Sequence, residues 1–134
     1  MKKYPHGFWA DGTRKFSVDA LFKLVQDRVP TEVSLRRLIR ANAETETREG
    51  NFGHLIQNPT PEFKSRVHQA DPTYPILLSP TGWIVDGTHR VAKLHWQGAT
   101  RVWAHILSDE DLHQAVMERR SVLGFGDWKK DPLF

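Results

Sequence analysis

The sequence predicts a mixed α/β domain in which a small mixed sheet is flanked by helices. Three observations predict this class. Two short apolar segments, 74–78 and 83–85, surround the turn sequence Ser-Pro-Thr-Gly, as the strands of a hairpin do. Residues 88–97 have helical spacing and end before Gly98, which stands where a helix C-terminus favours glycine. Residues 101–107 are largely apolar on both faces, as expected of an interior strand.

Composition predicts one ordinary soluble domain. The chain has 134 residues, 39% hydrophobic and 26% charged, without repeats or low-complexity runs, so we expect a single domain over 1–134. No segment has the length of a transmembrane helix, and the basic start lacks an apolar export segment, so a cytoplasmic location is expected. The absence of cysteine excludes disulfides, cysteine-bound zinc and a thiol nucleophile. The net charge of +3 suits a protein that handles phosphates but is also common on ordinary surfaces.

Local signals predict two helices before the hairpin. Ser17 stands as an N-cap before apolar residues at helical spacing, and Pro30 closes that segment. Thr60 followed by Pro61 is a strong helix start and predicts a helix over 61–70.

Two segments between these helices are harder to assign. Residues 31–40 fit either a short strand, in which Val33 and Leu35 alternate, or a helix on Leu35, Leu38 and Ile39, and we favour a strand followed by a turn. The polar run 42–50 has no apolar period, so it is predicted to be a loop of the kind that can serve as a substrate lid.

The ends of the chain carry weaker signals. Residues 1–16 and the tail from Gly124 are predicted to be irregular. Ser108 and Asp111 resemble a capping box with a shortened acid, which predicts a helix with Leu112, Ala115, Val116 and Arg119 on one side.

The candidate functional motif is the passage from strand to helix over residues 83–90. The first turn of a helix leaves backbone N–H groups unpaired and carries partial positive charge, so it attracts an anion such as phosphate. Gly87 allows a tight turn and close approach of a ligand, whereas Thr88 and His89 offer side-chain donors. Arg90 can clamp phosphate oxygens with its planar guanidinium, and Lys93, one turn later, can reach the same anion.

Asp86 stands at the end of the strand, where site residues of open sheets usually lie. It is a candidate to bind Mg²⁺ or to accept a substrate proton. Structural alternatives are that Asp86 caps the helix and that Arg90 pairs with a surface carboxylate. The other histidines lack the spacing of a metalloprotease site.

Residues 73–107 resemble the ParB/sulfiredoxin-like superfamily. The shared pattern is Pro-Ile followed by Gly-x-hydrophobic-x-Asp-Gly-x-His-Arg-x-Ala, then a glycine and a hydrophobic strand. Residues 17–72 resemble the small stand-alone ParB-like proteins more loosely. The resemblance implies a compact α/β fold in which Gly87, His89 and Arg90 bind nucleotide phosphates.

The activities of this superfamily differ, and the sequence excludes one of them. Sulfiredoxins use a cysteine at the position of Thr88, so their chemistry is excluded here. Partition proteins bind CTP and clamp DNA, but they carry an Arg-rich version of the motif and a helix-turn-helix domain after it; residues 108–134 are few for such a domain, so we do not expect one here. Free-serine kinases keep an Asp-Gly-x-His-Arg type motif, and their proposed base is a glutamate in the N-terminal half, for which Glu44 is the nearest counterpart.

The leading functional hypothesis is a nucleotide-binding protein that transfers phosphate from ATP or ADP to a small hydroxyl substrate. Mg²⁺, Arg90 and the 87–90 turn would neutralise charge, and Asp86 or Glu44 would take the hydroxyl proton. A second hypothesis is a DNA-associated accessory protein or nuclease, supported by the basic pI and by the clusters Arg36-Arg37-Arg40 and Arg119-Arg120. A third is an interaction module with a vestigial nucleotide site.

Overall fold

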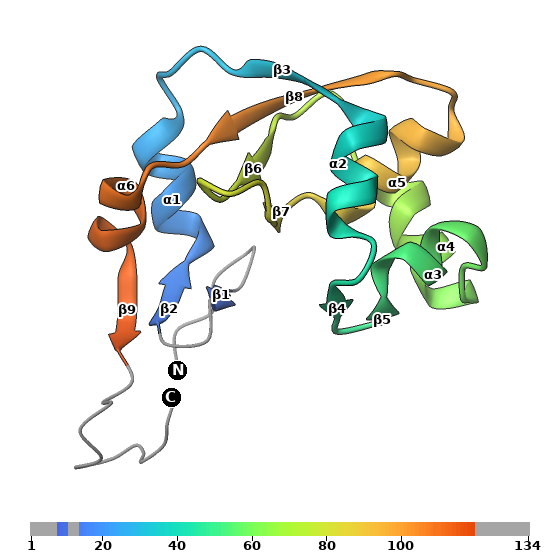
Figure 1. The fold of residues 1–134 in the computed structure, drawn as a ribbon, viewed down its shortest axis with the longest axis horizontal. Helices are drawn as coiled ribbons and strands as arrows, with labels where there is room; N and C mark the ends of the chain where they lie inside the picture. Colours follow the sequence, from blue (N-terminus) through green and yellow to red (C-terminus); the bar gives the residue numbers. More distant parts are fainter. Residues whose placement is uncertain (1–7, 11–13, 120–134) are drawn as a thin grey trace. The chain divides into compact units, whose positions relative to one another are not determined.

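The computed structural model describes residues 8–10 and 14–119, in which six helices and nine strands occur (Figure 1). The chain forms two compact units. One comprises residues 29–106 and is called the central unit below; the other combines residues 1–28 with 107–134 and is called the terminal unit.

The central unit is built on a four-stranded mixed sheet with the strand order β3-β8-β6-β7. Strand β8 (Arg101–Ile106) is antiparallel to β3 (Thr31–Ser34) and parallel to β6 (Ile76–Leu78), and β6 forms an antiparallel hairpin with β7 (Ile84–Asp86). The predicted mixed α/β class, the predicted hairpin and the interior position of β8 are therefore confirmed.

Helices of the central unit share one apolar core with the sheet, and Figure 1 shows α2 (Leu35–Asn42) beside α5 (Thr88–Trp96). The core joins Leu35 and Leu38 of α2 to Val91 and Ala92 of α5. Sheet residues complete it, together with side chains from α3 (Phe52–Gln57) and α4 (Pro61–Gln69); the fully buried ones among them include Phe52, Phe63, Ile76 and Ala104. The predicted helices over 61–70 and 88–97 are thus confirmed within a residue at their ends.

Two sequence assignments in this unit were wrong. The strand at 31–34 is followed by helix α2 rather than by a turn, because the Ser34 side chain caps the helix by accepting a hydrogen bond from the Arg37 N–H. The run 42–50 is not a loop, since it ends the helix and then forms the hairpin of β4 (Glu46–Thr47) and β5 (Gly50–Asn51). Helix α3 was not predicted.

Asn42 explains why the polar run is ordered at its start. This side chain is 1% exposed and connects α2 to the β6–β7 turn and to β7. Its Nδ2 donates to the carbonyl oxygens of Leu38 and Gly82 at 2.9 and 3.1 Å, and its Oδ1 accepts from the Ile84 N–H at 3.0 Å. Both N–H donors of this buried amide and its oxygen thus have a hydrogen-bond partner within the protein.

The terminal unit contains helix α1 (Val18–Val25), helix α6 (Asp109–Gln114) and an antiparallel sheet of order β1-β2-β9. Its strands are β1 (Phe8–Ala10), β2 (Arg14–Ser17) and β9 (Val116–Arg119). The predicted irregularity of residues 1–16 was therefore wrong where the structure describes them. Val116 and Arg119 belong to a strand rather than to a helix face, because the Ala115 carbonyl already accepts the Ser17 N–H as the chain leaves α6. The tail from Gly124 and Arg120 lie outside the described residues.

The predicted capping of both terminal-unit helices is confirmed. The Ser17 hydroxyl accepts from the Ala20 N–H, and Ser108 and Asp111 form the complete reciprocal capping box. The Asp111 carboxylate also accepts a hydrogen bond from each Nη atom of Arg28, both at 2.8 Å. These hydrogen bonds, the one from Arg28 above all, hold the pKa of Asp111 at about 2, below the ordinary 3.8.

None of the helices described is both long and apolar enough to cross a bilayer.

Candidate functional site

The turn between β7 and α5 requires glycine at position 87. Gly87 has φ +118°, in the region that favours glycine. A Cβ added there would lie 2.8 Å from Cβ of the fully buried Ile76 and overlap its Cγ2. The sequence therefore places the backbone of this turn directly against the core.

The N-terminus of α5 has no side-chain cap. Gly87 is the N-cap residue, and its carbonyl accepts the first helical hydrogen bond, from the Val91 N–H at 2.9 Å. Asp86 does not cap the helix, contrary to one of the alternatives. The N–H groups of the first turn, at Thr88, His89 and Arg90, thus lack the oxygen that an N-cap side chain usually supplies, and an anion can take that place.

Arg90 and Asp86 form a brace beside this turn. Nη2 of Arg90 lies 2.8 Å from Oδ2 of Asp86, and Nη1 donates to the Pro75 carbonyl at 2.6 Å. The side chains are 14% and 18% exposed, respectively. Arg90 does pair with a carboxylate, but the carboxylate is the neighbouring Asp86 rather than one at the surface. Asp86 and Arg90 were both expected to face a ligand. They are instead bound to each other, and Arg90 is also bound to the backbone just before β6.

Lys93 is also engaged elsewhere. Its Nζ donates to the carbonyls of His68 and Ala70, both at 2.8 Å, at the C-terminus of α4. Cations stabilise helix C-termini by satisfying the last carbonyls. In the conformation observed, Lys93 joins α5 to α4 and does not point to the start of its own helix.

The acid that reaches the motif is Glu49, from the turn of the β4–β5 hairpin. Its Oε1 lies 2.7 Å from Nε2 of His89, and its Oε2 lies 2.9 Å from Nη1 of Arg66. The Glu49 side chain is 13% exposed, and Oε2 is buried without a hydrogen-bond partner among the described residues. The contact with Arg66 is therefore an ion pair whose geometry leaves an Oε2 lone pair unused.

The hairpin turn itself fixes the position of Glu49. The Thr47 hydroxyl donates to the Gly50 carbonyl at 2.7 Å and accepts from the Glu49 N–H at 3.1 Å. On the other side, the His89 ring packs against Phe63, with ring centroids 5.3 Å apart. His89 is thus held between a carboxylate and an aromatic ring.

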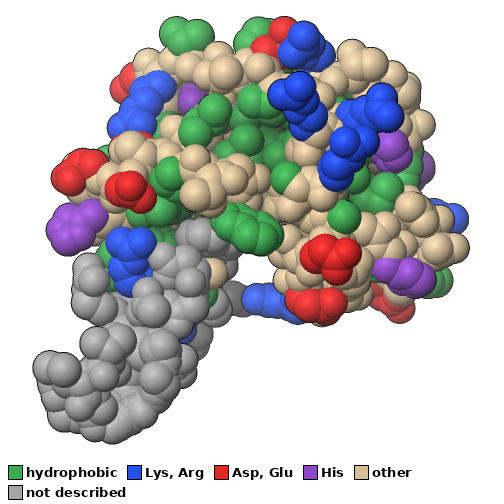
Figure 2. Space-filling model, in the orientation of Figure 1, with side chains coloured by type: hydrophobic (Ala, Val, Ile, Leu, Met, Phe, Trp, Pro, Cys, Tyr) green, Lys and Arg blue, Asp and Glu red, His purple; other side chains and the backbone are tan. Residues whose placement is uncertain are grey.

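Glu44 is placed differently from Glu49. It lies exposed in the turn that follows α2, and no contact described for residues 86–93 involves it. Figure 2 shows acidic side chains over the region of the β4–β5 hairpin. One feature of the sequence could have indicated that Glu49 lies in a hairpin turn. Gly50 follows it directly, and this glycine has φ +131°, which permits the tight hairpin.

Asp86 is poorly suited to hold Mg²⁺. Arg90 already neutralises its carboxylate at 2.8 Å, so a cation would compete with a fixed guanidinium. Within the described part of the chain, no three His, Asp or Glu side chains gather as metal ligands.

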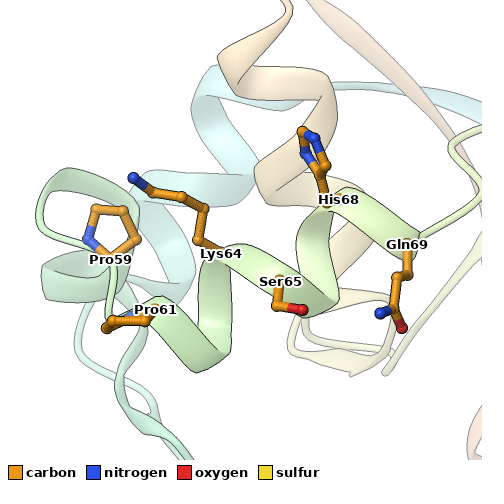
Figure 3. A pocket seen from close by; sticks show the side chains of 6 residues that line it. All are labelled: Pro59, Pro61, Lys64, Ser65, His68 and Gln69. Atoms are coloured by element: carbon orange, nitrogen blue, oxygen red, sulfur yellow. The ribbon is translucent and has the colours of Figure 1, made fainter.

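Among the residues that the structure describes, the central unit has a surface hollow along α4 and another between α2 and α5, and residues 86–90 line neither of them. One, of about 460 Å³, lies along α4, where Figure 3 shows Lys64 and His68 projecting to one side and Pro59 and Pro61 at the helix start. The other, of about 550 Å³, lies between the start of α2 and the end of α5.

The chain matches no protein-family model, no curated protein and no solved structure. The resemblance of residues 73–107 to the ParB/sulfiredoxin-like superfamily therefore stands on its motif alone.

Proposed function

We propose that the N-terminus of α5 binds the terminal phosphate of a nucleotide, with ATP, ADP and CTP as candidates. The protein then transfers this phosphate to a small hydroxyl compound. One observation carries the proposal: a largely buried carboxylate, Glu49, is brought across 40 residues of sequence to His89, in the first turn of a helix without a side-chain cap. The superfamily resemblance supports the same site.

The roles of the residues follow from their positions. Backbone N–H groups of Thr88, His89 and Arg90 donate hydrogen bonds to the phosphate oxygens, as those of helix N-termini do to anions. The Arg90–Asp86 pair holds the turn in shape. Glu49 replaces Glu44 and Asp86 as the preferred proton acceptor, because it touches His89 in the first turn of α5, whereas Asp86 is already paired with Arg90 and no contact described for this turn involves Glu44.

The transfer step balances with these groups. The acceptor oxygen forms a bond to the terminal phosphorus, the bond from that phosphorus to the bridging oxygen breaks, and the electron pair leaves with the shortened nucleotide. The hydroxyl proton passes to Oε2 of Glu49. Arg66, whose side chain is 57% exposed, must swing aside for the acceptor to reach that atom.

Binding is tested by calorimetric titration with ATP, ADP and CTP, with and without Mg²⁺. The informative variant is Thr88→Glu, because an acid in the first turn favours the helix but repels phosphate; Thr88→Gln is the uncharged control of the same size. We expect Thr88→Glu to lose at least about tenfold in affinity, whereas Thr88→Gln retains binding. Absence of binding at millimolar nucleotide, or equal binding by both variants, overturns the proposal.

Transfer is tested separately, by following nucleotide turnover with a panel of small hydroxyl compounds that begins with L-serine and glycerol. Glu49→Gln should retain nucleotide affinity and lose turnover, since the amide cannot take the proton. Glu44→Gln is the matched control and should turn over as the parent does. If Glu44→Gln abolishes turnover and Glu49→Gln does not, the assignment of the base is wrong.

A further inference from the structure

Helix α2 carries a basic face that the phosphate site does not use. Arg36, Arg37 and Arg40 are exposed, and among the described residues no carboxylate forms an ion pair with any of them. At 3.6 residues per turn, the three lie within about 100° of one another, and Arg36 and Arg40 are separated by about 6 Å along the axis. Figure 2 shows Lys and Arg side chains gathered over this part of the molecule.

The 550 Å³ hollow adjoins this face. Its apolar lining includes Leu35, Ile39 and Ala99, and two planar polar side chains, Arg36 and His95, also line it. Gly98 also lines the hollow, and the space beside it is open, since a Cβ added there would meet nothing within 4 Å. A hollow of this size is in the range of small-ligand sites.

We propose that this surface binds single-stranded nucleic acid, with one base in the hollow and the adjoining phosphates on Arg37 and Arg40. Unpaired bases stack on imidazole and guanidinium planes, and both planes line this hollow. Arginine forks match both phosphate and carboxylate geometry, so it is the adjoining hollow with its two planar side chains that favours nucleic acid over a merely acidic surface. A base within a duplex is stacked on its neighbours and cannot enter such a hollow, so the single strand is the expected form.

This surface is distinct from the proposed phosphate site. The hollow includes His95 and Gly98, at the C-terminal end of α5, whereas residues 87–90 form its N-terminal end. The helix spans nine residues, which separates its ends by about 13 Å. An experiment that disproves one of the two proposed sites therefore leaves the other proposal standing.

The test is fluorescence anisotropy with labelled 12-nucleotide dT and rU oligomers and a duplex of the same length, over a salt series. We expect the single strands to bind more tightly than the duplex, with affinity falling steeply as salt rises. His95→Ala should weaken binding about tenfold through lost stacking. Arg40→Ala should weaken it severalfold and reduce the salt slope by about one phosphate contact.

Lys64→Ala is the matched control, because it removes one exposed positive charge from α4 and should change affinity less than twofold. Matching thermal melts for all variants establish that each is folded. Three results overturn the proposal: no binding of either oligomer at low salt, tighter binding of the duplex with no effect of His95→Ala, or competition by poly-glutamate equal to that by the oligomer. The last result would indicate an acidic protein partner instead.

Discussion

Replacing Gly87 by alanine tests how the β7–α5 turn is built. Two penalties combine at this position. An L-residue at φ +118° costs about 1–3 kcal/mol in backbone strain. The new Cβ also overlaps Cγ2 of Ile76 and lies 2.8 Å from its Cβ, and overpacking of a core costs about 1–3 kcal/mol more. We expect Gly87→Ala to lower the free energy of unfolding by about 2–6 kcal/mol.

The assay is urea unfolding followed by tryptophan fluorescence, since Trp83, Trp96 and Trp103 lie in the central unit. Gly98→Ala is the internal control. Gly98 also has a positive φ, +82°, but an added Cβ would meet nothing within 4 Å, so it reports the backbone penalty alone, about 1–2 kcal/mol. A double variant, Gly87→Ala with Ile76→Ala, should be less destabilised than the sum of its parts by about 1 kcal/mol. If Gly87→Ala costs no more than Gly98→Ala, the close packing against Ile76 is refuted.

Three further predictions concern stability. Because the pKa of Asp111 is lowered to about 2, its pairing stabilises the fold above the ordinary value of 3.8 and is lost as pH falls from there toward 2. Between pH 3.8 and pH 2, the free energy of unfolding of Asp111→Asn should therefore fall less than that of the parent, by about 1–2 kcal/mol after allowance for the half-exposed Arg28. If the two proteins lose stability equally over this range, the pairing does not stabilise the fold. Asn42→Ala should cost about 2–4 kcal/mol in urea unfolding, because it leaves the Ile84 N–H and the Gly82 carbonyl without their partner. Asn42→Asp should be at least as destabilising, and near-neutral behaviour of either variant would contradict the account. Lys93→Met should speed hydrogen exchange in the last turn of α4 at a cost of about 1 kcal/mol, whereas exchange as in the parent would show that Lys93 does not hold that turn.

Local signals were sufficient for some helix starts but not for others, since Ser34 and Asn51 also act as N-caps and their helices were missed. Ser17, Thr60 and the Ser108–Asp111 pair were placed correctly as caps, because an N-cap needs only its own helix. The β6–β7 hairpin and α5 followed from their turn and periodicity. These signals were therefore enough to predict the secondary structure around the candidate motif.

Tertiary contacts decided what local signals left open. The run 42–50 has no apolar period, yet it is ordered by Asn42, whose partners Gly82 and Ile84 are 40 and 42 residues away. The residues that contact the motif could not be predicted from the sequence for the same reason. No spacing rule indicates that Glu49 reaches His89 or that Lys93 reaches the end of α4, because both contacts depend on how separate elements pack.

The hairpin that carries Glu49 also offers a point of control for protein engineering. Its turn is closed by the Thr47 hydroxyl, which accepts from the Glu49 N–H and donates to the Gly50 carbonyl, so that Arg48 and Glu49 lie within the closed turn. A single residue inserted there lengthens a surface turn, which folded proteins usually tolerate, yet it rotates or displaces the carboxylate from His89. Loop length alone can therefore disconnect the acid from the helix start while the apolar core stays intact.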